Sequence, residues 1–273
     1  MLDTTFLLEA DERGWPASLS APFPDACAEA NWLAGEPLYD CATVPSPDGP
    51  LYGGGTEPDP YGPRYGAGTV QESRHVVPVG SVEFVDGFLA RQGLGQLQAM
   101  NIPPELEHER FLGRRVFRDV RKETLPQLEA EHGPLLVKPG RRPKLFEAAR
   151  ASDLSVVPND EPLFVSQLLQ EPIVAEWRVF ILRGRVLDIR PYIMDRWVCP
   201  GRAMVEDMAR MLRRHAALAL DVGVLETGRA VAIECHPFIA CGLYGFEGPN
   251  LLRMAKSAWL EELRRQGRNP DMF

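Results

Sequence analysis

The chain has 273 residues, of which 45% are hydrophobic and 25% charged, and its formal net charge is −8. A chain of this length can bury a large core, divided among two or three closely packed subdomains. The negative charge argues against general nucleic-acid binding. No apolar run approaches the roughly 20 residues of a membrane span, so no membrane partner is expected.

The cysteines and the N-terminus indicate the compartment. The five cysteines contain no Cys-x-x-Cys pair, which argues against a zinc site and favours reduced thiols; they are Cys27, Cys41, Cys199, Cys235 and Cys241. The first ten residues lack a basic segment followed by an apolar stretch and a cleavage site. We therefore expect a cytoplasmic protein.

The first hundred residues predict an α/β unit. Scattered apolar residues over 1–43 indicate one strand and a short helix. Residues 44–69 are rich in Pro and Gly and predict a long loop. The Gly run at 53–55 favours a flexible loop over a phosphate site, because no helix with Lys-Ser/Thr follows it. A strand ending near residue 79 and a helix over 82–92, with Ser81 as its N-cap, complete the unit.

A basic cluster follows a predicted turn and short helix at 103–110. As a helix, the cluster places most of its charges on one face; as a strand from Arg114, its pattern is less regular. It is either a solvated face or a wall that faces polyphosphate. Its members are Arg110, Arg114, Arg115, Arg118, Arg121 and Lys122.

The second half of the chain alternates strands, hairpins and helices. Lys138 ends a buried strand and precedes a basic loop at 140–144. In a hairpin that turns at Gly184, Glu176 and Arg178 share one face. The predicted segments are helices at 125–131, from about 145, at 205–220 and at 251–265, strands at 135–139 and 164–169, and a hairpin formed by 176–182 and 186–192.

The stretch from Asp221 to His236 predicts a second hairpin, in which Gly228 can supply the positive φ of the turn. Its carboxylates, Asp221 and Glu234, fall at the same end of the hairpin. Glu234 and His236 are two positions apart and therefore share a face. The stretch is either an ordinary hairpin with solvated carboxylates or a metal site.

Phosphoryl transfer from a metal-bound nucleotide needs these parts together. Lysines and arginines hold the phosphates, carboxylates hold divalent ions, and an apolar strand covers the base. Oxygen ligands suit Mg²⁺.

The order and spacing of these segments resemble the ATP-grasp superfamily, in particular its clade of carboxylate–amine ligase-like proteins named for two arginines and a lysine. The resemblance covers about residues 76–246. It rests on the segments 78–84, 113–117, 137–139 with Lys144, 176–178, 221–224, 234–236 and 243–245.

The resemblance implies an α/β fold class with α+β subdomains. An N-terminal α/β subdomain would occupy residues 1–100. An ATP-grasp domain would occupy 101–273, with its two subdomains divided near residue 160 and ATP held between them.

The resemblance also implies an enzyme, an ATP-grasp carboxylate–amine (or thiol) ligase. ATP would phosphorylate the carboxylate of a small molecule or peptide, and an amine would attack the acyl phosphate. Arg178 and Arg190 would stabilise charge on the transferred group. Mg²⁺, or Mn²⁺, would lie on Asp221, Glu234 and His236. The residues implied to bind the nucleotide are Arg114, Lys138, Lys144, Ser166, Gln167, Leu168, Leu169 and Glu176.

Two departures from the family pattern bear on activity. Where the family usually has Asn, this chain has His236, which either ligates the ion or only hydrogen-bonds a phosphate. The loop from Gly140 holds one glycine, fewer than many relatives. These departures keep open a weakened or inactive nucleotide-binding module, and a kinase that stops at the phosphorylated product is a further alternative.

Overall fold

The computed structural model describes residues 2–11, 15–45, 73–153, 155, 157–194 and 197–269. The chain forms two compact units: unit 1 comprises Met1–Gly95 and Phe238–Phe273, and unit 2 comprises Gln96–Pro237. The last 36 residues, which the resemblance places in the ATP-grasp domain, thus group with the N-terminal residues. The predicted loop at 44–69 lies outside the described residues, apart from the end of a strand at 44–45. None of the helices in the described ranges has the length and apolar character needed to cross a lipid bilayer.

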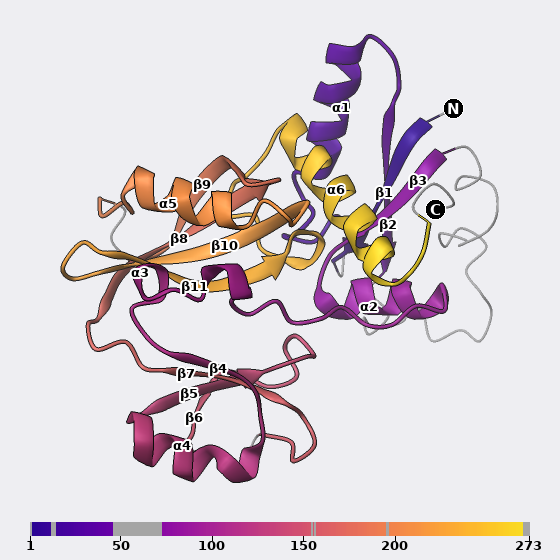
Figure 1. Cartoon of the computed structure of the whole chain (residues 1–273). Coiled ribbons are helices and arrows are strands. Elements are labelled where there is room, and N and C mark those ends of the chain that lie inside the picture. Colours follow the sequence, from indigo (N-terminus) through magenta and orange to yellow (C-terminus); the bar gives the residue numbers. More distant parts are fainter. Residues whose placement is uncertain are drawn as a thin grey trace. The chain divides into compact units, whose positions relative to one another are not determined.

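Unit 1 is built on a parallel three-stranded sheet in the order β2-β1-β3 (Figure 1). Phe6, Phe84 and Trp259 are fully buried in its core. Ser81 caps the helix after β3, as predicted, by accepting a hydrogen bond from the Phe84 amide. The elements of unit 1 are β1 (Leu2–Ala10), α1 (Phe23–Ala34), β2 (Tyr39–Pro45), β3 (Ser73–Val79), α2 (Val82–Arg91), a 3₁₀ turn (Phe238–Ala240) and α6 (Pro249–Arg265).

Unit 2 contains two antiparallel four-stranded sheets, and the chain passes from one to the other between β7 and β8. The first sheet has the order β4-β7-β5-β6. Its core includes Leu125, Val137 and Val165, so α4 packs on its apolar face. The elements of this part are 3₁₀ turns (Pro104–Leu106 and Lys122–Thr124), α3 (Glu109–Leu112), β4 (Val116–Val120), α4 (Leu125–His132), β5 (Leu135–Pro139), β6 (Ala149–Arg150) and β7 (Leu163–Gln167).

The second sheet of unit 2 has the order β11-β10-β8-β9. Alternation along its strands gives it one apolar and one polar face. On the apolar face, Val179 and Leu220 form a core with Met208 of α5 and with Leu212, the residue that follows α5. The elements are β8 (Ile173–Leu182), β9 (Arg185–Met194), α5 (Arg202–Met211), β10 (Ala217–Leu225) and β11 (Ala230–Pro237). Both predicted hairpins are therefore confirmed.

The structure corrects two helices predicted from the sequence and settles whether part of the basic cluster is a helix or a strand. The helix predicted over 205–220 ends at Met211, because Ala217–Leu225 is a fully buried central strand. Apart from Asp221 this strand is apolar, and its pattern does not distinguish it from a buried helix. The short helix predicted from residue 145 is absent from the described residues there, where the chain forms only the two-residue β6. Within the basic cluster, Val116–Val120 is a strand.

Candidate active site

A polar row crosses the second sheet of unit 2 from edge to edge. Glu234 on β11 pairs with Asp221 on β10, which pairs with Arg178 on β8, which pairs with Arg190 on β9. Directly paired residues in antiparallel strands point to the same face. The row therefore places two acidic and two basic side chains along one surface, opposite the apolar core.

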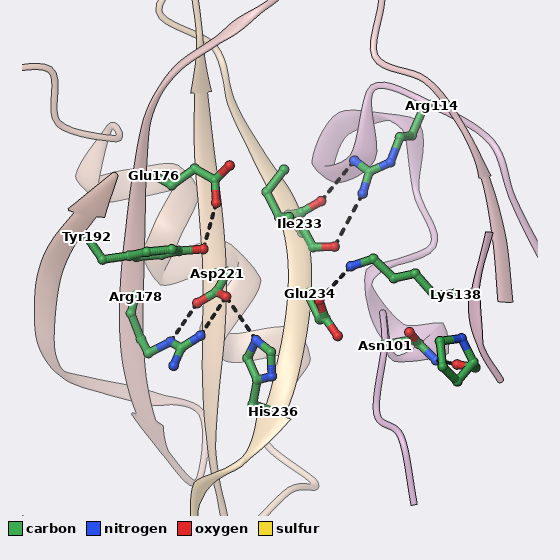
Figure 2. Close-up of polar contacts among 12 residues, drawn as sticks. Asn101, Arg114, Lys138, Glu176, Arg178, Tyr192, Asp221, Ile233, Glu234 and His236 are labelled. Atoms are coloured by element: carbon green, nitrogen blue, oxygen red, sulfur yellow. Dashed lines mark hydrogen bonds and ion pairs between the residues drawn. The ribbon is translucent and has the colours of Figure 1, made fainter. Parts of the chain in front are cut away.

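Asp221 is the centre of this row. Its carboxylate accepts two hydrogen bonds from Arg178, from Nε to Oδ1 and from Nη2 to Oδ2, both 2.8 Å long. Oδ2 also lies 2.9 Å from Nε2 of His236 (Figure 2). Asp221 and Arg178 are only 4% and 6% exposed. Burial by itself raises the pKa of Asp221, but the hydrogen bonds and charges of Arg178 and His236 outweigh burial and lower that pKa to about 2.

Lys138 links the two sheets of unit 2. It lies on β5, and its Nζ is 2.5 Å from Oε2 of Glu234 on β11. A strand-end lysine and a hairpin carboxylate, far apart in sequence, thus lie next to each other, and their phosphate-binding and metal-binding roles stay predictions. The ion pair is partly exposed, with side-chain exposures of 18% and 29%.

Arg114 binds backbone carbonyls in this structure. Its Nη1 donates to the carbonyls of Leu112 and Ala232, at 3.1 and 3.0 Å, and its Nη2 donates to that of Ile233, at 3.4 Å. Burial lowers the pKa of the Arg114 guanidinium to about 10. Arg114 therefore ties the segment after α3 to β11.

Glu176 is also on the polar face, but its carboxylate is engaged. Oε2 accepts a hydrogen bond of 2.6 Å from the hydroxyl of Tyr192. Burial, and then the negative charges of Asp221 and Glu176, raise the pKa of Tyr192, so the phenol remains a donor. Tyr192 was not singled out in the sequence, although it lies on the same hairpin as Glu176.

A cavity of about 340 Å³, the hinge pocket, lies beside Lys138 and the chain crossing between the two sheets. Six of the residues predicted to bind nucleotide line it, Arg114 and Lys138 among them. The full lining is Arg114, Leu136, Lys138, Arg150, Phe164, Ser166, Gln167, Leu168, Leu169, Glu171, Ile173 and Ile233. The predicted nucleotide residues Lys144 and Glu176 are not in this lining.

Glu171 is a residue of the hinge pocket that was not predicted from the sequence. Its Oε2 is buried and has no hydrogen-bond partner among the described residues. A buried carboxylate oxygen that accepts no hydrogen bond destabilises the folded chain. A ligand with a hydrogen-bond donor at this position would remove that cost. Its position two residues after the predicted adenine-contacting segment at 166–169 was the available signal.

A larger cavity of about 640 Å³ shares Arg114, Gln167, Leu169 and Glu171 with the hinge pocket. Its other lining residues come from the segment 107–117 around α3 and the start of β4, from Gln170 and from the tip of the β10–β11 hairpin. It contains neither Lys138 nor any residue of the polar row. We therefore place the candidate nucleotide site in the smaller hinge pocket, which is lined by Lys138 and lies beside the polar row that Lys138 contacts.

The predicted metal ligands lie together on one surface, and their carboxylates have the chemistry that Mg²⁺ prefers. Within the described ranges, however, no group of three His, Cys, Asp or Glu side chains is arranged to hold an ion. Asp221 faces Arg178, and Glu234 faces Lys138. The carboxylates and the imidazole have the chemistry to bind a divalent ion. Arg178 and Lys138 would have to move away from the carboxylates before the ion could bind.

Two predicted residues lie away from these contacts. Arg190 belongs to the polar row, but its Nε donates to Asp188 at 2.7 Å. Lys144 is exposed and has a positive φ of 57°. It is the last residue of the basic loop and does not line the hinge pocket.

Unit 2 has two four-stranded antiparallel sheets. Lys138 of the first sheet contacts the β10–β11 hairpin of the second, which carries Asp221 and Glu234. This arrangement is that of the ATP-grasp class of fold. Residues 111–254 match the family model for the ATP-grasp domain, family 2 of the clade named for two arginines and a lysine, and the chain belongs to this family. The resemblance inferred from the sequence, and the fold class that it implied, are thus confirmed.

Solved structures agree on the fold. The chain is similar to a RimK domain ATP-grasp protein from Sphaerobacter thermophilus, with a TM-score of 0.55 and 13% identity, covering 94% of this chain and 99% of that one. It is also similar to a D-alanine–D-alanine ligase from Bacillus anthracis, with a TM-score of 0.52, 13% identity and coverage of 97% and 100%. For D-cycloserine synthetase DcsG, the values are 0.51, 14%, 95% and 99%. No curated protein matches.

Proposed function

We propose that the chain is an ATP-dependent ligase that activates a substrate carboxylate as an acyl phosphate and joins it to an amine. The observation that supports this most is the pairing of Lys138 with Glu234. This pairing brings Lys138, the cation of the hinge pocket that would bind phosphate, next to the polar row. The solved ATP-grasp ligases of similar fold add support at the level of the fold alone.

The hinge pocket suits ATP. Leu136, Ile173 and Ile233 offer apolar surfaces to a flat base. Main-chain groups of the segment 166–169 would hold the edge of adenine. The unpartnered Oε2 of Glu171 would accept a hydrogen bond from a nucleotide hydroxyl. Lys138 and Arg150 would draw the phosphates toward the polar row.

The residues of the polar row would then serve the transfer. The γ-phosphoryl group passes from ATP to a carboxylate oxygen and leaves ADP. The amine attacks the carbonyl carbon and loses a proton, and the bond to phosphate breaks. Arg178 and Arg190 stabilise the charge that develops on the transferred group. When bound by Asp221, Glu234 and His236, Mg²⁺ or Mn²⁺ would neutralise phosphate charge.

Nucleotide binding and product chemistry test this proposal separately. Calorimetry with a non-hydrolysable ATP analogue should show tighter binding with Mg²⁺ than without it. Phosphate release should then appear with a panel of small-molecule and peptide carboxylates paired with amines, and hydroxylamine should trap the acyl phosphate as a hydroxamate. Equal affinity with and without metal would argue against this site.

One observation favours a second candidate, a nucleotide-binding module without turnover. Both oxygens of Asp221 are bound by Arg178, and Oδ2 also faces His236. If that network persists with nucleotide bound, Asp221 cannot serve an ion. Tight nucleotide binding without phosphate release over the whole panel would decide for the module.

A further inference from the structure

Glu234 owes its direction to an irregularity in β11. Residues Leu218–Asp221 pair with Pro237–Glu234 in one register, and the register shifts by one between Asp221 and Val222, which pairs with Ala232. Ile233 is the extra residue of this β-bulge. Because side chains alternate along a strand, the extra residue determines which face Glu234 takes relative to the rest of β11.

The bulge lies on an edge strand of its sheet. β11 is the outermost strand of its sheet, so no further strand of the described residues pairs with its outer backbone groups. Two groups of the chain supply partners instead. Arg114 donates to the carbonyls of Ala232 and Ile233, and the carbonyl of Asn101 accepts from the amide of Cys235. These contacts lie on both sides of Glu234 in the sequence, and Figure 2 shows those of Arg114.

The segment before β4 is shaped to deliver Arg114 to this edge. α3 ends at Gly113 in the left-handed region, with a φ of 61°. A Cβ at Gly113 would lie 3.4 Å from Cγ1 of Val231 and 3.5 Å from the Arg229 guanidinium. The turn thus brings the backbone close to β11, and the guanidinium of the next residue reaches two consecutive carbonyls of that strand.

We propose that Arg114 is a positioning residue: its guanidinium fixes the β11 bulge and thereby directs the Glu234 carboxylate toward Lys138. This differs from the direct nucleotide contact that the family resemblance implied for Arg114. A phosphate contact needs a positive charge, which lysine also supplies. Holding carbonyls at three points needs the planar fork of arginine, which lysine lacks.

Hydrogen exchange tests the positioning role without any turnover. In the ligand-free wild-type chain, the peptide that covers β11 should exchange slowly. In Arg114→Lys its exchange should accelerate about tenfold or more, because a fork that bridges two carbonyls is lost. The matched control is Arg115→Lys, which changes an exposed neighbour and should leave β11 unchanged. Fast exchange of β11 in the wild type, or wild-type exchange in Arg114→Lys, would overturn the proposal.

The wild-type chain offers a second readout that needs no variant to fold. If Arg114 only positions β11, adding a non-hydrolysable ATP analogue should leave the protection of β11 unchanged or raise it. If Arg114 leaves the carbonyls to bind phosphate, that protection should fall, and the proposal is wrong.

The effect on turnover rests on the proposed ligase function. There, Arg114→Lys should lower kcat at least about tenfold with less than about a threefold change in the KM for ATP. A KM that rises in Arg114→Ala and returns to the wild-type value in Arg114→Lys would indicate a phosphate contact and contradict the positioning role. Absence of turnover in the wild type would contradict the ligase proposal alone, since the exchange measurements do not depend on it.

Discussion

Lys138 of β5 and Glu234 of β11 belong to two different sheets of unit 2, and their charged groups lie 2.5 Å apart. Lys138 lines the hinge pocket, and Glu234 belongs to the polar row. While the two are paired, a ligand must compete with Lys138 for Oε2 of Glu234. Nucleotide binding would therefore exchange a protein–protein ion pair for contacts of both groups with the ligand.

Replacing Lys138 with Ala should lower ATP affinity by about 1.5–3 kcal/mol, because a charge-assisted contact to phosphate is lost. The free energy of unfolding should change by less than about 1 kcal/mol, since the ion pair is partly exposed. Calorimetry and urea unfolding measure the two effects. Lys256→Ala is the matched control, because it breaks a similar ion pair, with Asp3 in unit 1. An unchanged ATP affinity in Lys138→Ala would place the nucleotide elsewhere.

Asp221→Asn should destabilise the fold by about 3–5 kcal/mol at neutral pH, because it leaves the buried guanidinium of Arg178 without its counter-charge. Asp188→Asn, which removes the partner of Arg190 at a more exposed site, should cost less than about 1 kcal/mol. Chemical unfolding measures both variants. Equal costs would mean that the polar row contributes no more than a surface ion pair.

The lowered pKa of Asp221 predicts acid sensitivity. Because this pKa is about 2 in the folded chain, against an ordinary value of 3.8, ionised Asp221 contributes about 2 kcal/mol of stability. The contribution is complete above about pH 4 and is lost as the pH falls through about 2. Unfolding free energies of wild type and Asp221→Asn between pH 2 and 6 should therefore converge toward the acid end. Parallel curves over this range would contradict the assignment.

Glu234→Gln should abolish ATP turnover, because it removes a full negative charge from the face where the ion and phosphates would meet. Glu226→Gln, at the exposed turn of the same hairpin, is the control and should retain activity. A coupled assay for ADP release compares the two. Full activity of Glu234→Gln would make the hairpin structural.

His236→Asn should shift the ion preference of turnover toward Mg²⁺. It replaces an imidazole, which favours Mn²⁺ relative to an all-oxygen site, with the oxygen donor usual in the family. The measurement is the ratio of initial rates with Mg²⁺ and with Mn²⁺, in wild type and variant. An unchanged ratio would mean that His236 serves Asp221, which it contacts at 2.9 Å, and no ion.

Local patterns were enough to predict the two hairpins and the strand that ends at Lys138. In a hairpin the partner strands are neighbours in sequence, so the turn places Asp221 and Glu234 at the same end of the hairpin. The bulge at Ile233 could not be predicted, since no glycine or proline marks it. It left Glu234 directly opposite Asp221, which a simple turn count does not give.

Contacts between strands that are not hairpin neighbours could not be predicted from the sequence. β8 pairs with β10 although β9 and α5 lie between them in sequence, and this pairing brings Arg178 onto Asp221. Arg114 was assigned to the nucleotide from the family resemblance, whereas its contacts here include carbonyls of a strand more than a hundred residues later. Charge predicts a kind of partner, and only tertiary packing determines which one is within reach.

The division of the chain into two units also determines the order in which their parts are completed during synthesis on the ribosome. Unit 2 is one continuous segment, whereas unit 1 draws on both ends of the chain, and α6 supplies it with the buried Trp259. Residues 96–237 therefore emerge complete while the sheet of unit 1 still lacks the helix that covers its core. β1, β2 and β3 are therefore synthesised well before α6, which follows all of unit 2. Until α6 is made, these strands expose an apolar surface to which chaperones can bind.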